Sequence, residues 1–142
     1  MKRTPAGLIK RIRSLLKPST ETLAARRLLS AVMAEARRPE LYSQAAVADT
    51  IDGRFDLVVL YLYFVLRRLR SEGPAGQALG QLLFDAAFAN FDEALREMGV
   101  GDLSVGKKIR KMAEAFYGRV EAYEKAREAP HDFAAAVVRN VY

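Results

Sequence analysis

The segment from Gly101 to Lys107, GDLSVGK, has the spacing of a phosphate-binding loop, G-x-x-x-x-G-K. In nucleotide-binding proteins this loop follows a β-strand, and a Ser or Thr after the lysine binds Mg²⁺. Here the next residue is Lys108, and the preceding segment FDEALREM has a helical pattern. We therefore interpret the segment as a turn between two helices, capped by Asp102 or Ser104, and not as a nucleotide site.

A cluster of basic residues follows this turn and is the candidate partner-binding site. Its members are Lys107, Lys108, Arg110 and Lys111. Cations near a helix N-terminus are unfavourable because the helix dipole is positive there. A helical projection places the three lysines opposite the apolar side chains of the same helix, so they are expected to face outward. The cluster predicts contact with an acidic protein surface, a lipid headgroup or an RNA phosphate, and the alternative is a basic face that contacts only water.

No pattern in the chain supports catalysis or metal binding. The chain has no cysteine and one histidine, His131, which follows Pro130 at an expected helix start and is predicted to lie at the surface. No carboxylate pair or nucleophile–base pair has the context of an acid/base couple. We therefore predict no catalytic residue, no metal ion and no cofactor, and a protein that is not an enzyme.

The stretch at residues 55–69, FDLVVLYLYFVLRRL, is the element around which the rest of the chain is expected to pack. Every residue from 57 to 66 is apolar or aromatic. As a helix, ten residues rise about 15 Å, half the hydrocarbon thickness of a bilayer, so a buried central helix is predicted. Asp52 is the expected N-cap, and arginines in the last turn suit a helix C-terminus. These flanking residues disfavour the alternative of a buried strand.

The remaining pattern predicts further helices and no strand. Helices are expected from about Thr20 to Arg37, from Gly73 to Met98, from Ser104 to just before Pro130, and from Asp132 to Tyr142. Gly99 is the expected C′ glycine of the second of these, and residues 40–53 are expected to form an irregular loop. With a first helix in the N-terminal arm, the prediction is an all-α, single-domain bundle of about six helices around residues 55–69.

The N-terminal arm carries the whole positive charge of the protein. The net charge is +6; residues 1–20 hold six basic residues and no acid, and the other 17 basic residues balance the 17 acidic ones. Domain boundaries are therefore predicted at residues 1–18 for a basic amphipathic arm and 19–142 for a helical domain. The apolar and basic sides of the arm suit a membrane interface. The candidate membrane-surface residues are Leu8, Ile9, Lys10, Arg11, Ile12, Arg13, Leu15, Leu16 and Lys17.

Two other interpretations of the arm remain open. Its apolar stripe suits a first helix that docks on the core of the domain and leaves its basic residues in water. An arginine-rich, acid-free segment also suits a mitochondrial transit peptide, although this arm leads almost directly into folded sequence.

Three stretches of the chain together resemble the ubiquinol–cytochrome c chaperone family. They are DTIDGRFDLVVLYLYFVLRRL at 49–69, FDEALREMGVGDLSVGKKIRKMAEAFYGR at 91–119, and VVRNVY at 137–142. The most specific part is MGVGDLSVGKK followed by AFYGR. The resemblance implies an all-α domain, without catalytic residues, that assists assembly of the cytochrome bc1 complex. Because mitochondrial relatives act with a partner protein on newly made cytochrome b, it implies cytochrome b or another bc1 subunit as the client, and a partner chaperone.

The resemblance and the lack of a long presequence together indicate a bacterial member of that family. The expected location is the bacterial cytoplasm, peripheral at the cytoplasmic face of the inner membrane, with an anionic membrane surface as a further contact. The alternatives are a lipid-surface-binding helical protein without a client and a ribosome- or RNA-associated basic helical module. Nucleic acid is disfavoured because the body is not net basic and carries no RNA-binding signature.

Deletion of residues 1–17 is expected to release the protein from vesicles that contain anionic lipid. Each basic residue near such a surface contributes about 1 kcal/mol, and this attraction is screened by salt. The full chain should therefore co-sediment with the vesicles at low salt and leave them at high salt. Equal partitioning of the full and shortened chains would contradict the membrane role and favour an arm docked on the core.

Overall fold

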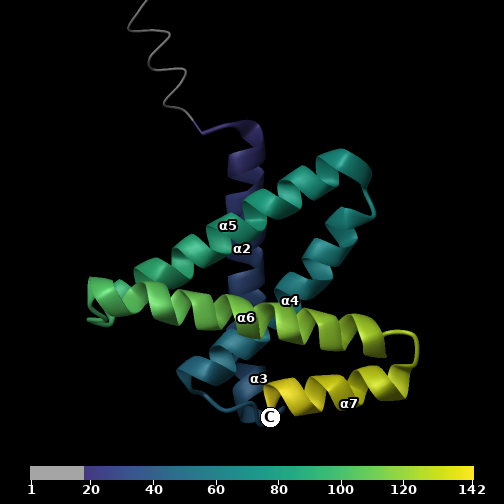
Figure 1. Ribbon diagram of the computed structural model, residues 1–142. Coiled ribbons are helices and arrows are strands. Elements are labelled where there is room, and N and C mark those ends of the chain that lie inside the picture. The colour runs from purple at the N-terminus through teal and green to yellow at the C-terminus, as the bar shows by residue number, and fades with distance from the viewer. Residues whose placement is uncertain (1–17) are drawn as a thin grey trace, which may run out of the picture.

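Residues 18–142 are described by a computed structural model, and in them six α-helices and no β-strand are found (Figure 1). The helices are α2 (Thr20–Ala36), α3 (Pro39–Ser43), α4 (Ile51–Arg70), α5 (Gly73–Glu97), α6 (Asp102–Ala126) and α7 (Pro130–Val141). This confirms the all-α fold class. The predicted membrane-surface residues of the arm lie outside the described part of the chain.

Helix α4 is the element against which most of the others pack. It contacts α2, α5, α6 and α7. Leu57, Val59 and Leu62 are at most 3% exposed and belong to the main hydrophobic core. A helix that is apolar on all sides is stable only where neighbours cover every face. The predicted central position of residues 55–69 is therefore confirmed.

The start and the second half of α4 differ from the expectation. Thr50, and not Asp52, is the N-cap: its hydroxyl accepts a hydrogen bond from the Gly53 amide at 3.1 Å. A Cβ atom at Gly53 would lie 2.0 Å from the Ala48 carbonyl oxygen, so only glycine allows this close approach of the preceding loop. Further along α4, Phe64 is 47% exposed. Full burial is thus confined to the first two-thirds of the helix.

Residues 40–53 are not the irregular loop that was expected. Pro39–Ser43 form α3, with the proline in its first turn, where a missing amide hydrogen costs nothing. The Tyr42 hydroxyl donates a hydrogen bond to the Ala36 carbonyl at 2.7 Å and so fixes α3 to the end of α2. The sequence interpretation ended the preceding helix at about Arg37 and did not use Pro39 as the start of another, although proline also starts helices.

The turn between α5 and α6 confirms one expectation and corrects another. Gly99 has φ +85°, and the amides of Gly99 and Val100 donate to the carbonyls two and three positions before the C-cap, which is a Schellman motif. Helix α6 begins at Asp102, its N-cap is Gly101, and no side chain caps it. The predicted capping role of Asp102 or Ser104 is therefore wrong; Asp102 instead forms an ion pair with Arg96 across the turn.

Two helical hairpins and α2 make up the body. Helices α4 and α5 form one hairpin, α6 and α7 form the other, and α2 crosses the first of them (Figure 1). The C-terminus lies near α3, where the Tyr142 hydroxyl donates a hydrogen bond to the Ala45 carbonyl. Within residues 18–142, each helix falls short of the length and apolar character that crossing a bilayer requires.

Leu62→Asp is expected to prevent stable folding, because Leu62 is fully buried in α4. An unpaired buried carboxylate costs several kcal/mol, a large part of the roughly 5–15 kcal/mol that stabilises a domain. Phe64→Asp, two positions along the same helix but 47% exposed, should lose roughly 1 kcal/mol. Urea unfolding followed by circular dichroism measures both variants, and equal stabilities would place Leu62 at the surface.

Candidate binding groove

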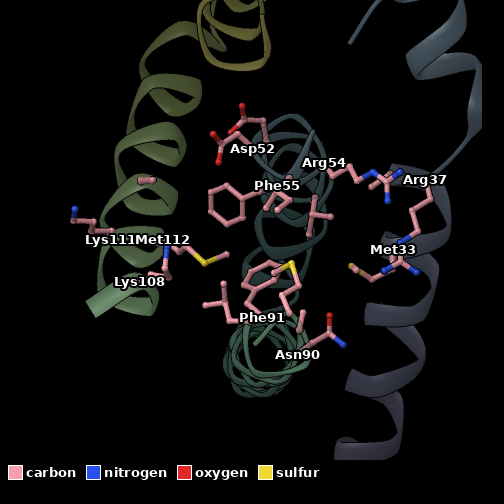
Figure 2. Close-up of a pocket in the computed structure, with 18 of the residues that line it drawn as sticks. Met33, Arg37, Asp52, Arg54, Phe55, Asn90, Phe91, Lys108, Lys111 and Met112 are labelled. Carbon is pink, nitrogen blue, oxygen red and sulfur yellow. The ribbon is translucent and has the colours of Figure 1, made fainter. Parts of the chain in front are cut away.

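A groove of about 610 Å³ opens beside the N-terminal half of α4, between α2, α5 and α6 (Figure 2). Phe55 and Val58 of α4 and Phe91 and Leu95 of α5 supply its apolar floor. Helix α6 forms one wall and α2 the other. This volume lies in the range of sites that bind ligands.

Three methionines from three different segments line the groove. Met33 belongs to α2, Met98 is the C-cap residue of α5, and Met112 belongs to α6. Met98 is 52% exposed. Methionine side chains are unbranched and polarisable, so they adapt to partners of varied shape. The groove therefore presents an apolar surface that adapts to ligands of different shapes.

A buried ion pair joins α4 to α6 at the floor of the groove. Arg119 Nη2 lies 2.6 Å from Asp56 Oδ1, and the two side chains are 22% and 13% exposed. Burial raises the pKa of the Asp56 carboxyl above its usual value, and the opposing pull of Arg119 only partly offsets this. The Arg119 guanidinium also lies over the Phe55 ring, 5.6 Å from its centroid. The pair thus fixes both the α4–α6 spacing and the position of Phe55.

The polar groups at this ion pair are incompletely hydrogen-bonded. Within residues 18–142, Asp56 Oδ1, Arg119 Nε and the buried Tyr123 hydroxyl have no hydrogen-bond partner. The Asp56 carboxylate is held by the charge of the Arg119 guanidinium at 2.6 Å. Burial raises the pKa of Tyr123 to about 12, so its hydroxyl stays neutral. These groups cost stability, and the surrounding packing holds them in place.

The walls of the groove carry positive charge. Lys108 and Lys111 line it from α6, and Arg37 and Arg54 lie on the other side (Figure 2). Arg54 is paired with Asp49 at 2.7 Å. Within the described residues, Arg37, Lys108 and Lys111 form no ion pair. Besides Asp56, one other acid of this part of the chain, Asp52, lines the groove. The site is an apolar floor between cationic walls.

The structure divides the predicted basic cluster into two pairs. All four side chains are exposed, which confirms the outward orientation derived from the helical projection. Lys108 and Lys111 line the groove, whereas Lys107 and Arg110 lie outside it. Because α6 begins at Asp102, the cluster lies beyond the first helical turn, where the dipole effect has fallen off. The helix dipole therefore disfavours these cations less than expected, and the binding role of the cluster stays a prediction.

Sequence reasoning missed the residues that form the floor of the groove. The sequence interpretation assigned no site role to Asp56. A lone carboxylate beside ten apolar residues does signal a buried cationic partner. That partner, Arg119, lies 63 positions away, and only the packing of α6 on α4 identifies it. His131 is exposed, as predicted, and no group of His, Asp and Glu within residues 18–142 could hold a metal ion.

An all-helical body with an open, adaptable apolar groove defines the class of a binding protein. The sequence profile of the ubiquinol-cytochrome C chaperone family matches residues 43–142, so the chain belongs to this family. The matched part contains α4 to α7 and therefore the floor and the α6 wall of the groove.

Known proteins of the same kind resemble the chain over most of its length. It is 22% identical to the ubiquinol-cytochrome-c reductase complex assembly factor 1 of Xenopus laevis, over 72% of this chain and 52% of that protein. The Mus musculus protein of the same name is 22% identical over 84% of this chain and 41% of its own length. The chain thus spans about half, or less, of the length of these relatives. The crystal structure of the Cbp3 homolog from Brucella abortus superposes with a TM-score of 0.73 and 35% identity, covering 96% of this chain and 74% of that one.

Arg119→Met is expected to destabilise the protein, because it leaves the Asp56 carboxylate buried without its cation. We expect the free energy of unfolding at pH 7 to fall by roughly 2–3 kcal/mol, less than for a fully buried pair because Arg119 is partly exposed. The double variant Asp56→Leu/Arg119→Met should regain most of this loss, since an apolar pair leaves no unpaired charge. Urea titrations of the three proteins measure the difference.

The loss in Arg119→Met should depend on pH. Burial raises the pKa of Asp56 in the folded state, and removal of the cation raises it further. A carboxyl group with a raised folded-state pKa destabilises the fold as pH rises from the unfolded to the folded pKa. The deficit should therefore be complete at pH 7 and smaller near pH 4, where Asp56 binds a proton. A deficit that is constant over this range would attribute the loss to packing instead.

Proposed function

We propose that this protein is a non-enzymatic assembly factor for the ubiquinol–cytochrome c reductase (bc1) complex. Its groove would hold an apolar segment of a newly made subunit, with cytochrome b as the first candidate. Membership of the ubiquinol-cytochrome C chaperone family supports the process. The Xenopus laevis and Mus musculus relatives are named as assembly factors of that complex.

The observation that carries the proposal is the apolar groove lined by three methionines. A subunit that has not yet met its partners exposes apolar surface, which aggregates unless it is covered. An α-helix is about 10–12 Å across with its side chains, so an open groove covers one face and leaves the other in water. Flexible methionines let the same surface accept and later release different apolar side chains. Such a site binds and protects without requiring a chemical step.

The proposed place of action is the cytoplasmic face of the bacterial inner membrane. The basic, amphipathic pattern of residues 8–17 supports contact with anionic lipids there. A partner chaperone, as the family resemblance implies, would bind the body outside the groove. An apolar floor favours a protein client over RNA, because phosphates need cations across the contact surface and not only at its edges.

Glutamate at two exposed apolar positions in the groove, Ile51→Glu/Met98→Glu, is expected to impair assembly of the bc1 complex. Both residues line the groove and are 64% and 52% exposed, so the fold should survive. Carboxylates there should weaken binding of an apolar client about tenfold. The measurement is the amount of bc1 complex on native gels, and of haem b by difference spectra, in a strain lacking the natural gene.

The matched control, Leu103→Glu/Val138→Glu, changes two residues that are 94% and 56% exposed and lie outside the groove. It adds the same charge and should support normal assembly at the same protein abundance. Normal bc1 levels in cells with the groove variant would contradict the role of the groove. Normal levels in cells with no chain at all would overturn the proposed function.

A further inference from the structure

The cations of the groove flank its apolar floor on both sides. Lys108 and Lys111 line the groove from α6, although the amino group of Lys111 points away from the floor, and Arg37, the C-cap residue of α2, lies on the opposite wall (Figure 2). These three side chains form no ion pair within residues 18–142, although Arg38, the neighbour of Arg37, pairs with both Glu35 and Glu40. Ion pairing thus neutralises Arg38 but not the three wall cations, and among the described residues the one other unpaired charge that lines the groove is Asp52 at the start of α4.

We infer that the groove selects an apolar helix whose apolar stripe is bordered by acidic side chains. This inference rests on the proposed function and specifies the client segment. The stripe would lie on the apolar floor of α4 and α5 side chains, next to the three methionines, and an amphipathic helix has such a stripe on about 100° of its surface. Its carboxylates would lie on either side, one row near Lys108 on α6, with Lys111 reaching it by a change of side-chain rotamer, and the other near Arg37 on α2.

The charge of the groove disfavours the protein's own arm as the occupant. Residues 1–17 are amphipathic and short enough to fill a groove, but they carry six basic residues and no acid. Cationic walls repel such a segment. A single anionic lipid fits less well than a helix, because its negative charge is at one end whereas the cations stand on two opposite walls. An acid-bordered helix contacts both walls at once.

The test uses the full chain and two fluorescein-labelled synthetic peptides of 18 residues. Both peptides form amphipathic helices with the same leucine and alanine stripe, which is bordered by glutamates in one and by lysines in the other. The wild-type protein is expected to bind the glutamate peptide about tenfold more tightly, with a difference that shrinks at high salt. Fluorescence anisotropy measures the two dissociation constants.

A pair of charge-reversed variants locates the selectivity. Lys108→Glu/Lys111→Glu should weaken binding of the glutamate peptide about tenfold and tighten binding of the lysine peptide. Lys107→Glu/Arg110→Glu reverses the same number of charges on the same helix but outside the groove, and should change neither affinity by more than about twofold. All four changed residues are exposed, so both variants should keep the wild-type melting temperature.

Three results would overturn the inference. Equal affinity of the wild-type protein for both peptides would show that the walls do not select charge. Equal effects of the two double variants would show that overall charge acts, and not the groove. Displacement of the glutamate peptide by vesicles of phosphatidylglycerol and phosphatidylcholine would assign the groove to lipid.

Failure of this inference is distinguishable from failure of the proposed function. If Ile51→Glu/Met98→Glu abolishes bc1 assembly while the two peptides bind equally, the groove holds the client without charge selection. If the glutamate peptide is selected but bc1 levels are normal without the protein, the acid-bordered helix belongs to a client of another process.

Discussion

The burial of the first part of α4 on all its faces is the constraint on which the rest of the structure depends. Leu57, Val59 and Leu62 project in different directions around this helix, and each is covered. Covering them requires neighbours on every side, which α2, α5, α6 and α7 supply. The groove opens beside the N-terminal half of this helix, between α2, α5 and α6.

The ion pair of Asp56 with Arg119 shows what positions the α6 wall. Apolar side chains of similar size would fill the same space at equal or lower cost, since desolvation offsets much of the attraction between two buried charges. The pair therefore acts by position. It fixes where α6 lies along α4 and keeps the Phe55 ring beneath the Arg119 guanidinium.

The groove is built from helices far apart in the chain, and the family match does not include all of them. Residues 43–142 supply the floor and the α6 wall, whereas Met33 and Arg37 of α2 precede the matched segment. The similarity to the Brucella abortus structure covers 96% of this chain and so includes α2.

The sequence by itself determined the features that depend on residues close together along the chain. The long helices, the C′ role of Gly99, the central position of α4 and the outward lysines of α6 all follow from periodicity and capping chemistry. Thr50 and Asp52 are both good capping residues, and the choice between them depended on where the Gly53 amide points. Tertiary structure alone decided that Lys108 and Lys111 line a groove and that Asp56 meets Arg119, because both facts depend on how one helix is placed against another.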